Sequence, residues 1–332
     1  HISQKNEMGG RLNPLEIFKK NPSAKNFEKA LNFLWFKMGE IEQTKELIEE
    51  NPNHVAELAD VPQSLAYRVL GEARILQAQI VPERSQFPAY VAEPNRVMYC
   101  VHQSPVFNSN GYSTRTRGVT NGLKAAGGDV VVVARSGYPW DSKSDVAKPK
   151  IQRIQSQLDD VQYIHIPGGN LNREPIDQYV MQAADAFVRE ARIIRPSLIQ
   201  AASNYRTALP ALVAARRLGI PFVYEVRGLW EFTEASAKPG FENTERFDSM
   251  RTLETLVASS ADQVLAITPQ VKEELVSRGV DAERITVAPN SVDPEVFVPI
   301  PKDKDFAKSK KISVDVPVIG FAGSIVGYEG LD

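Results

Sequence analysis

The sequence predicts an α/β protein: a doubly wound, parallel Rossmann-like sheet preceded by an all-helical N-terminal extension. Two observations carry this prediction. Before residue 80 the apolar residues recur at helical spacings of three and four, and from residue 96 short β-branched runs alternate with helical stretches. Continuous apolar strands joined by helices are typical of a parallel sheet that is buried on both faces, and right-handed crossovers make it doubly wound.

Residues 14–79 hold the helical pattern, with Gly39 expected at a tight turn between two helices and Asn51-Pro52 at the end of the second. The pattern resembles one unit of a tetratricopeptide repeat. One unit cannot bury both of its faces, so a helix over 65–79 is expected to pack against it. The segment is then either a cap on the next domain or a module that recruits a protein partner.

A proline-marked linker (Pro82, Pro88 and Pro94) separates this segment from the expected sheet, because proline removes a backbone donor and disfavours helix before it. Seven strands are expected, over residues 97–101, 129–134, 162–166, 198–202, 222–226, 263–267 and 285–288. The sequence also predicts several helix ends. A helix over 113–126 is expected to end at Gly127-Gly128, another is expected to end at Gly219, and Thr268 is expected to cap a helix that begins at Pro269.

The chain has 332 residues, enough for about two domains. We expect a helical extension and linker over 1–90, the sheet domain over 91–300, and a linker with the first strand of a further domain over 301–332. Because the sequence starts at His1 and stops at Asp332 within a motif, we expect a piece of a longer protein.

Composition excludes several classes of protein. The 39 basic side chains are balanced by 41 acidic ones, so nucleic-acid binding is not expected. The single cysteine, Cys100, excludes an intramolecular disulfide framework and cysteine-rich metal sites, and it indicates a reducing compartment. With no apolar run near 20 residues and no signal-peptide pattern, we expect a cytoplasmic protein, at most peripheral to the inner face of the membrane.

Ligands of an open parallel sheet bind at the carboxyl ends of its strands. The loop after the first expected strand places Gly111, Tyr112, Ser113 and Arg115 at a helix N-terminus, where backbone N–H groups and the helix dipole suit an anion. The alternative is that Asn110-Gly111 forms only a turn and Ser113 only the N-cap.

Other cofactor and metal signals are weak. No Gly-Lys-Ser/Thr follows the first strand, and only one of the three dinucleotide-fingerprint glycines is present. The second strand ends at Arg135, which leaves an NADP-dependent dehydrogenase as a third option. Histidines 1, 54, 102 and 165 lack metal-site spacing, and no Gly-x-Ser-x-Gly elbow occurs, so we expect neither a metal nor a serine hydrolase.

The loop after the fifth expected strand is dense in charge and aromatic residues. Glu225, Arg227 and Glu231 would hold a polyhydroxylated ligand there, and Trp230 would offer an apolar face to a sugar ring. The alternative is that Arg227 pairs with one of the two glutamates and closes the loop.

Three ordered motifs resemble the family 4 retaining glycosyltransferases: GIPFVYEVRGLWE over 219–231, ADQVLAITP over 261–269, and RITVAPNSVD over 284–293 with Phe297. The resemblance covers about residues 96–332. It implies a GT-B architecture of two Rossmann-like domains, with the acceptor chiefly on the N-terminal one and the nucleotide-sugar donor on the other. The terminal glycine-rich turn (Gly323, Ser324 and Gly327) is similar to the opening of that second domain, where the donor phosphates would lie.

The sequence departs from the family pattern at two places. Gln200-Ala-Ala-Ser-Asn204 stands where many members carry His-x-His, so Ser203 or Asn204 would take over the contact with the donor sugar. Ser291 replaces the glycine after Asn290. The family's diphosphate-binding basic pair and its two-glutamate motif would lie beyond Asp332.

We therefore expect a metal-independent glycosyltransferase that moves a sugar from a nucleoside diphosphate to a glycan, lipid-linked or cell-envelope acceptor with retention, and we expect this chain alone to be inactive. The alternative is a non-catalytic binding module that recruits a protein through the helical segment. The catalytic candidates are Ser203, Asn204, Glu225 and Arg227, and the substrate-binding candidates are Gly111, Tyr112, Ser113, Arg115, Trp230, Glu231 and Asn290.

Overall fold

The computed structural model describes residues 12–86, 90–143, 153–313 and 317–323. By its internal contacts the chain divides into two compact units, residues 1–288 and 289–332. The described part of the second unit holds one short helix, α12 (Lys304–Ser309), in otherwise irregular backbone. The sheet and the N-terminal helices belong to the first unit.

An eight-stranded sheet forms the centre of the first unit, with the strand order β3-β4-β2-β1-β5-β6-β7-β8. Its strands are β1 (Arg96–Val101), β2 (Asp129–Ala134), β3 (Ile154–Leu158), β4 (Val161–His165), β5 (Leu198–Ala202), β6 (Phe222–Val226), β7 (Gln263–Ala266) and β8 (Ile285–Val287). All neighbours pair in parallel except β3 and β4. The predicted doubly wound α/β sheet is confirmed, and each of the seven predicted strands is present.

One strand was not predicted: β3, an edge strand that pairs with β4 in an antiparallel hairpin. Only its first and last residues, Ile154 and Leu158, are apolar, so it lacks the continuous apolar run that marks the buried strands. Asp159 and Asp160 join the two strands, and both have left-handed backbone, with φ of 51° and 57°. Two positive φ values match a tight hairpin turn, for which aspartate is well suited.

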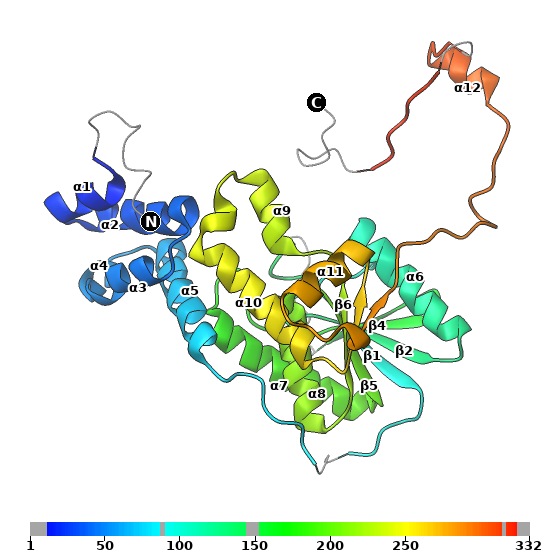
Figure 1. Ribbon diagram of the computed structural model, residues 1–332, viewed down its shortest axis with the longest axis horizontal. Helices are drawn as coiled ribbons and strands as arrows, with labels where there is room; N and C mark the ends of the chain where they lie inside the picture. The colour runs from blue at the N-terminus through cyan, green and yellow to red at the C-terminus, as the bar shows by residue number, and fades with distance from the viewer. Residues whose placement is uncertain (1–11, 87–89, 144–152, 314–316, 324–332) are drawn as a thin grey trace. The chain divides into compact units, whose positions relative to one another are not determined.

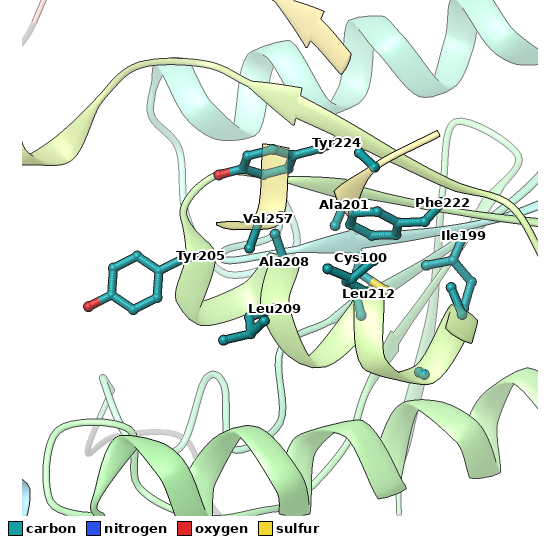
Figure 2. Packing of buried hydrophobic residues seen from close by; sticks show 14 of the residues in the cluster. Cys100, Ile199, Ala201, Tyr205, Ala208, Leu209, Leu212, Phe222, Tyr224 and Val257 are labelled. Carbon is teal, nitrogen blue, oxygen red and sulfur yellow. The ribbon is translucent and has the colours of Figure 1, made fainter. Parts of the chain in front are cut away.

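Helices cover both faces of the sheet: α6 (Gly111–Ala125), α7 (Ile176–Ile194), α8 (Tyr205–Leu218), α9 (Trp230–Ala237), α10 (Glu245–Ser260) and α11 (Pro269–Ser277) (Figure 1). Met98 and Cys100 of β1 lie in a hydrophobic cluster with side chains of α7, α8 and α10, and Figure 2 shows Cys100 near Leu212 of α8. Val97, Tyr99 and Val101 lie in a second cluster on the opposite face, with side chains of α6. Alternate residues of one strand therefore reach both cores.

The helix ends follow local chemistry. Gly219 ends α8 in left-handed backbone, and the Thr268 hydroxyl accepts a hydrogen bond from Val271 N at the start of α11, as predicted. The interpretation of Ser113 as an N-cap is wrong, because the Asn110 side chain caps α6 by accepting a hydrogen bond from Ser113 N.

The predicted all-helical segment is present as α1 (Pro14–Lys20), α2 (Ala24–Asn32), a π-helix (Phe33–Met38), α3 (Glu42–Glu49), α4 (Pro52–Ala56) and α5 (Asp60–Gln77). Gly39 makes the predicted turn, with φ of 69°. The predicted stop at Asn51-Pro52 is confirmed, because α3 ends at Glu49, and Pro52 also opens α4, where its missing N–H costs no helical hydrogen bond. As expected, α5 packs on the earlier helices in a core of their own.

This helical segment also packs closely on α7 and α10. Gly71 of α5 leaves so little space that a Cβ there would lie 2.6 Å from Pro175 Cβ, just before α7. The Glu245 carboxylate of α10 accepts hydrogen bonds from the backbone N–H groups of Ile41, at 2.5 Å, and Glu42, at 2.8 Å. It thus satisfies two N–H groups at the start of α3.

Within the described residues, no helix has both the length and the apolar character needed to cross a membrane.

Replacing Gly71 by alanine is expected to lower the free energy of unfolding by about 1–3 kcal/mol, because the new methyl group would overlap Pro175. Gly118→Ala is the matched control, since Gly118 also lies within a helix but has open space around it. That substitution is expected to raise stability by up to about 1 kcal/mol through helix propensity. Urea denaturation of the two variants measures the difference, and equal stability would contradict the close packing of α5.

Candidate functional site

Three central strands end side by side and gather most of the predicted site residues. Cys100 of β1 pairs with Ala201 of β5, and Ala202 pairs with Glu225 of β6. Because these strands are parallel, their carboxyl ends meet at one edge of the sheet. The first turn of α6 follows β1 at the same edge.

Glu225 is the centre of a buried polar network at this edge. Its side chain is 1% exposed, and Arg115 Nε donates to its Oε1 at 2.7 Å. Arg227 Nε donates to the same oxygen at 3.2 Å, and the Tyr99 hydroxyl donates to Oε2. Burial disfavours the charged carboxylate, but Arg227 and the hydrogen bonds from Tyr99, Arg227 and Arg115 outweigh it and lower the pKa of Glu225.

Arg227 ties this network to the start of α6. Its Nη1 donates to the Tyr112 carbonyl oxygen at 2.8 Å and to Thr116 Oγ1 at 2.9 Å, and its guanidinium lies 4.3 Å from the centre of the Tyr112 ring. Its backbone N–H donates to Ser203 Oγ at 3.1 Å. The structure therefore contains the ion pair that the sequence analysis kept as an alternative, and the side chain of Arg227 is only 6% exposed.

The glycine loop presents both open and buried groups. Gly111 is exposed, with open space where a Cβ would lie. Tyr112 is held by His102 N, which donates to its hydroxyl at 2.9 Å, and burial raises the pKa of Tyr112 to about 12. Ser113 is buried, and its hydroxyl has no hydrogen-bond partner within the described part of the chain. Arg115 also donates to the carbonyl oxygen of Ala288 at 2.7 Å, after β8.

The two residues at the start of α9 face different surroundings. Glu231 is fully buried, and its Oε1 lies 2.7 Å from Nη1 of Arg278. Trp230 is 38% exposed, and its ring packs edge-on against His102 at a centroid distance of 5.4 Å. Trp230 is therefore open to a ligand, whereas Glu231 lies against α11.

Sequence reasoning missed His102, which directly follows β1. Its Nδ1 lies 3.0 Å from Thr207 Oγ1, and burial, helped by Arg135 and Arg206, lowers the pKa of His102 well below its usual value. The ring is therefore neutral at pH 7 and can act as a hydrogen-bond donor or acceptor. A single histidine does not indicate a metal site, so only its position directly after a strand pointed to a functional role.

Asn204 caps α8, because its Oδ1 accepts a hydrogen bond from Arg206 N. It is 1% exposed, yet its Nδ2 has no partner among the residues that the structure describes. Asn290 and Gly323 belong to the second unit, where both are exposed. Ser324 and Gly327 lie outside the described residues.

Two further observations concern cofactors. Arg135, the basis of the NADP option, is buried in an ion pair with Asp141 at 2.5 Å. Across residues 12–86, 90–143, 153–313 and 317–323, no three His, Cys, Asp or Glu side chains are grouped so that they could hold a metal ion.

A family model described as a glycosyl transferase 4-like domain matches residues 110–291. The match covers more than half of the 332 residues and runs from the N-cap of α6 to just beyond β8. The chain belongs to this family. The resemblance that we drew from the sequence motifs is confirmed.

Solved structures are similar to this glycosyl transferase 4-like chain. A sucrose-phosphate synthase from Thermosynechococcus elongatus aligns with a TM-score of 0.51 at 16% identity, over 67% of this chain and 54% of that chain. HepE from Anabaena, in complex with UDP-glucose, aligns with a TM-score of 0.41 at 14% identity, over 65% of this chain and 49% of that chain. The chain thus spans about half the length of each structure, and the synthase confirms the Rossmann-like half of a GT-B fold. No curated protein matches the chain.

Glu225→Gln is expected to lower the free energy of unfolding by about 3–5 kcal/mol at pH 7, because it leaves Arg115 and Arg227 buried without a counter-charge. The pKa of Glu225 is lowered by folding, so its contribution is fully present above the unfolded value of about 4.3. The contribution is lost as the pH falls through the lower folded value.

Urea denaturation between pH 7 and pH 3 measures this effect, and the gap between wild type and variant should narrow on acidification. The control is Glu242→Gln at an exposed position of the same unit, expected to change stability by less than about 0.5 kcal/mol. A gap that stays constant with pH would contradict the assigned charge of Glu225.

Proposed function

We propose that the chain forms the acceptor-side half of a retaining glycosyltransferase, which moves a sugar from a nucleoside-diphosphate sugar to a glycan, lipid-linked or cell-envelope acceptor. The family match over 110–291 carries this proposal, because it contains every residue that the sequence predicted for the carboxyl edge of the sheet. Open parallel sheets bind their ligands at this edge.

In this proposal the exposed and half-buried groups contact substrates, and those whose side chains are buried position them. Gly111 and the first N–H groups of α6 face the donor phosphates, whose charge suits a helix N-terminus without a metal ion. His102 and Trp230 contact the reacting sugars beside them. Glu225 and Arg227 are positioning residues, because both are buried against each other and against α6.

The chain alone is proposed to be inactive. Donor binding by the family's pattern needs a second Rossmann-like domain, and the described residues of the second unit form one short helix without a strand. Recruitment of a protein partner by the helical segment stays a prediction.

Transfer is tested with the protein expressed from its full reading frame, supplied with UDP- or GDP-linked sugars and a panel of acceptors. Mass spectrometry detects the product, and proton NMR assigns its anomeric configuration, which is expected to match that of the donor. The 332-residue chain alone should give no steady turnover. Steady turnover by this chain would contradict the proposal that it holds only the acceptor-side half of the enzyme. A product with inverted anomeric configuration would contradict retention.

Gly111→Leu is expected to reduce transfer at least tenfold without loss of stability, because its side chain would occupy the open space over the glycine loop. Gly118→Leu is the matched control, since Gly118 is also exposed on α6 with nothing near its missing Cβ. Equal transfer by both variants would show that the loop does not face the substrates.

A further inference from the structure

A cavity of about 150 Å³ lies between the N-terminal helical segment and the carboxyl edge of the sheet. Helix α5 and the π-helix supply one part of its wall, and the first turns of α8, α9 and α10 supply another. An apolar cavity of about this volume accommodates one benzene ring. The space therefore suits a single ring-sized unit of a ligand.

Three guanidinium groups line this cavity: those of Arg68, Arg206 and Arg246. Burial lowers the pKa of Arg68, and the nearby charge of Arg206 lowers it further. Burial also lowers the pKa of Arg246. Arginine nevertheless remains charged at pH 7, so three positive charges share the wall of one small cavity.

The three guanidinium groups differ in how directly they are paired, although the charge of Glu72 acts on Arg68 and Arg206. Within the described part of the chain, Arg68 makes no hydrogen bond or ion pair. The Arg206 side chain contacts the Tyr205 hydroxyl at 3.5 Å. Arg246 Nη2 lies 3.6 Å from the Glu234 carboxylate, which Lys238 already meets at 2.6 Å, and Arg246 Nη1 donates to the Trp35 carbonyl oxygen at 3.3 Å. A half-buried guanidinium without an ion-pair partner, such as that of Arg68, would be stabilised by an anionic ligand.

Three carboxylates also line the cavity, and they restrict which anion fits. Glu72 accepts a hydrogen bond from Ser249 Oγ at 2.5 Å, and Glu234 is paired with Lys238. Glu174 accepts a hydrogen bond from Asn170 N at Oε1, while its Oε2 is buried with no partner in the described structure. A ligand that carried only negative charge would leave this oxygen unsatisfied.

The remaining polar and aromatic groups match a sugar ring. The buried Asn204 Nδ2 is a hydrogen-bond donor without a partner in the described residues, and Glu174 Oε2 is a matching acceptor. Hydroxyl groups can satisfy both at once. Trp35 and Trp230 also line the cavity and provide apolar surface for the ring.

We propose that this cavity binds one sugar or similar polyol unit of the acceptor, and that the unit carries an anionic group, a phosphate or a carboxylate, which Arg68 and Arg206 contact. The proposal rests on the proposed glycosyltransferase function. The ring hydroxyls meet Asn204 and Glu174, and Trp230 connects the cavity to His102 at the end of β1. The helical segment thus determines which acceptor the enzyme accepts.

The test is a titration of tryptophan fluorescence in the whole chain, because two of its three tryptophans line the cavity. The probes are glucose, glucose 6-phosphate, glucuronate and inorganic phosphate. Glucose 6-phosphate or glucuronate should bind at least tenfold more tightly than glucose and than inorganic phosphate. A preference for one of the two identifies the anionic group as phosphate or carboxylate.

Arg68→Met keeps most of the side-chain volume and should abolish the tenfold preference. Arg192→Met, at an exposed position of α7, is the matched control and should leave it unchanged. Equal binding of glucose and its anionic derivatives by the wild-type chain would overturn the proposal whether or not Arg68→Met folds. Inorganic phosphate that binds as tightly as glucose 6-phosphate would overturn the sugar part.

This titration requires no catalysis, so its outcome is separable from that of the transfer assay. Transfer without any anionic preference would reject the cavity alone. Anionic binding without transfer by the full protein would reject the proposed enzyme and retain the cavity as a binding site.

Discussion

A carboxylate that has no access to water governs the layout of the functional edge. The negative charge of Glu225 must be compensated inside the protein. The groups that pair with it or donate hydrogen bonds to it come from β1, α6 and the end of β6. The ion pairs and hydrogen bonds of Glu225 therefore hold the first turn of α6 in place at the ends of the strands. Arg115 extends the same constraint to Ala288 at the end of β8. The exposed residues of the edge are therefore held by contacts that lie wholly in the interior.

Local patterns predicted the elements of the fold because the physics behind them is local. Buried parallel strands need continuous apolar runs, whereas β3 pairs with one neighbour at the sheet edge and has apolar residues only at its two ends. The contacts within the candidate site could not be predicted in the same way, because they depend on the tertiary fold. The sequence placed Arg227 and Glu231 among candidate ligand contacts, but it could not show that Glu231 meets Arg278, because that pairing depends on which loops the fold brings together. His102 carried no signal beyond its place after a strand.

The cavity lined by Arg68, Arg206 and Arg246 could not be predicted from the sequence either. Arg68 and Arg206 are 138 positions apart and lie in segments that the sequence divided between two domains. Neither belongs to a motif, and each reads alone as an ordinary charged residue on a helix. Their shared location arises from the packing of α5 on α7 and α10, which the small Gly71 permits. Helices that look like an accessory in the sequence thereby contribute one wall of a polar cavity.

The cap that Glu245 provides for α3 bears on how the chain is made. Ile41 and Glu245 are separated by 204 positions, so the start of α3 is completed by a residue that is synthesised much later. At about 5–20 residues per second, the ribosome takes roughly 10–40 s to cover that distance. Until α10 has been synthesised, the N-terminal helices lack part of the surface on which α5 packs, although α7 is made earlier. Protein quality control in the cell therefore meets them first as a separate, incompletely buried bundle, and only afterwards as part of the domain.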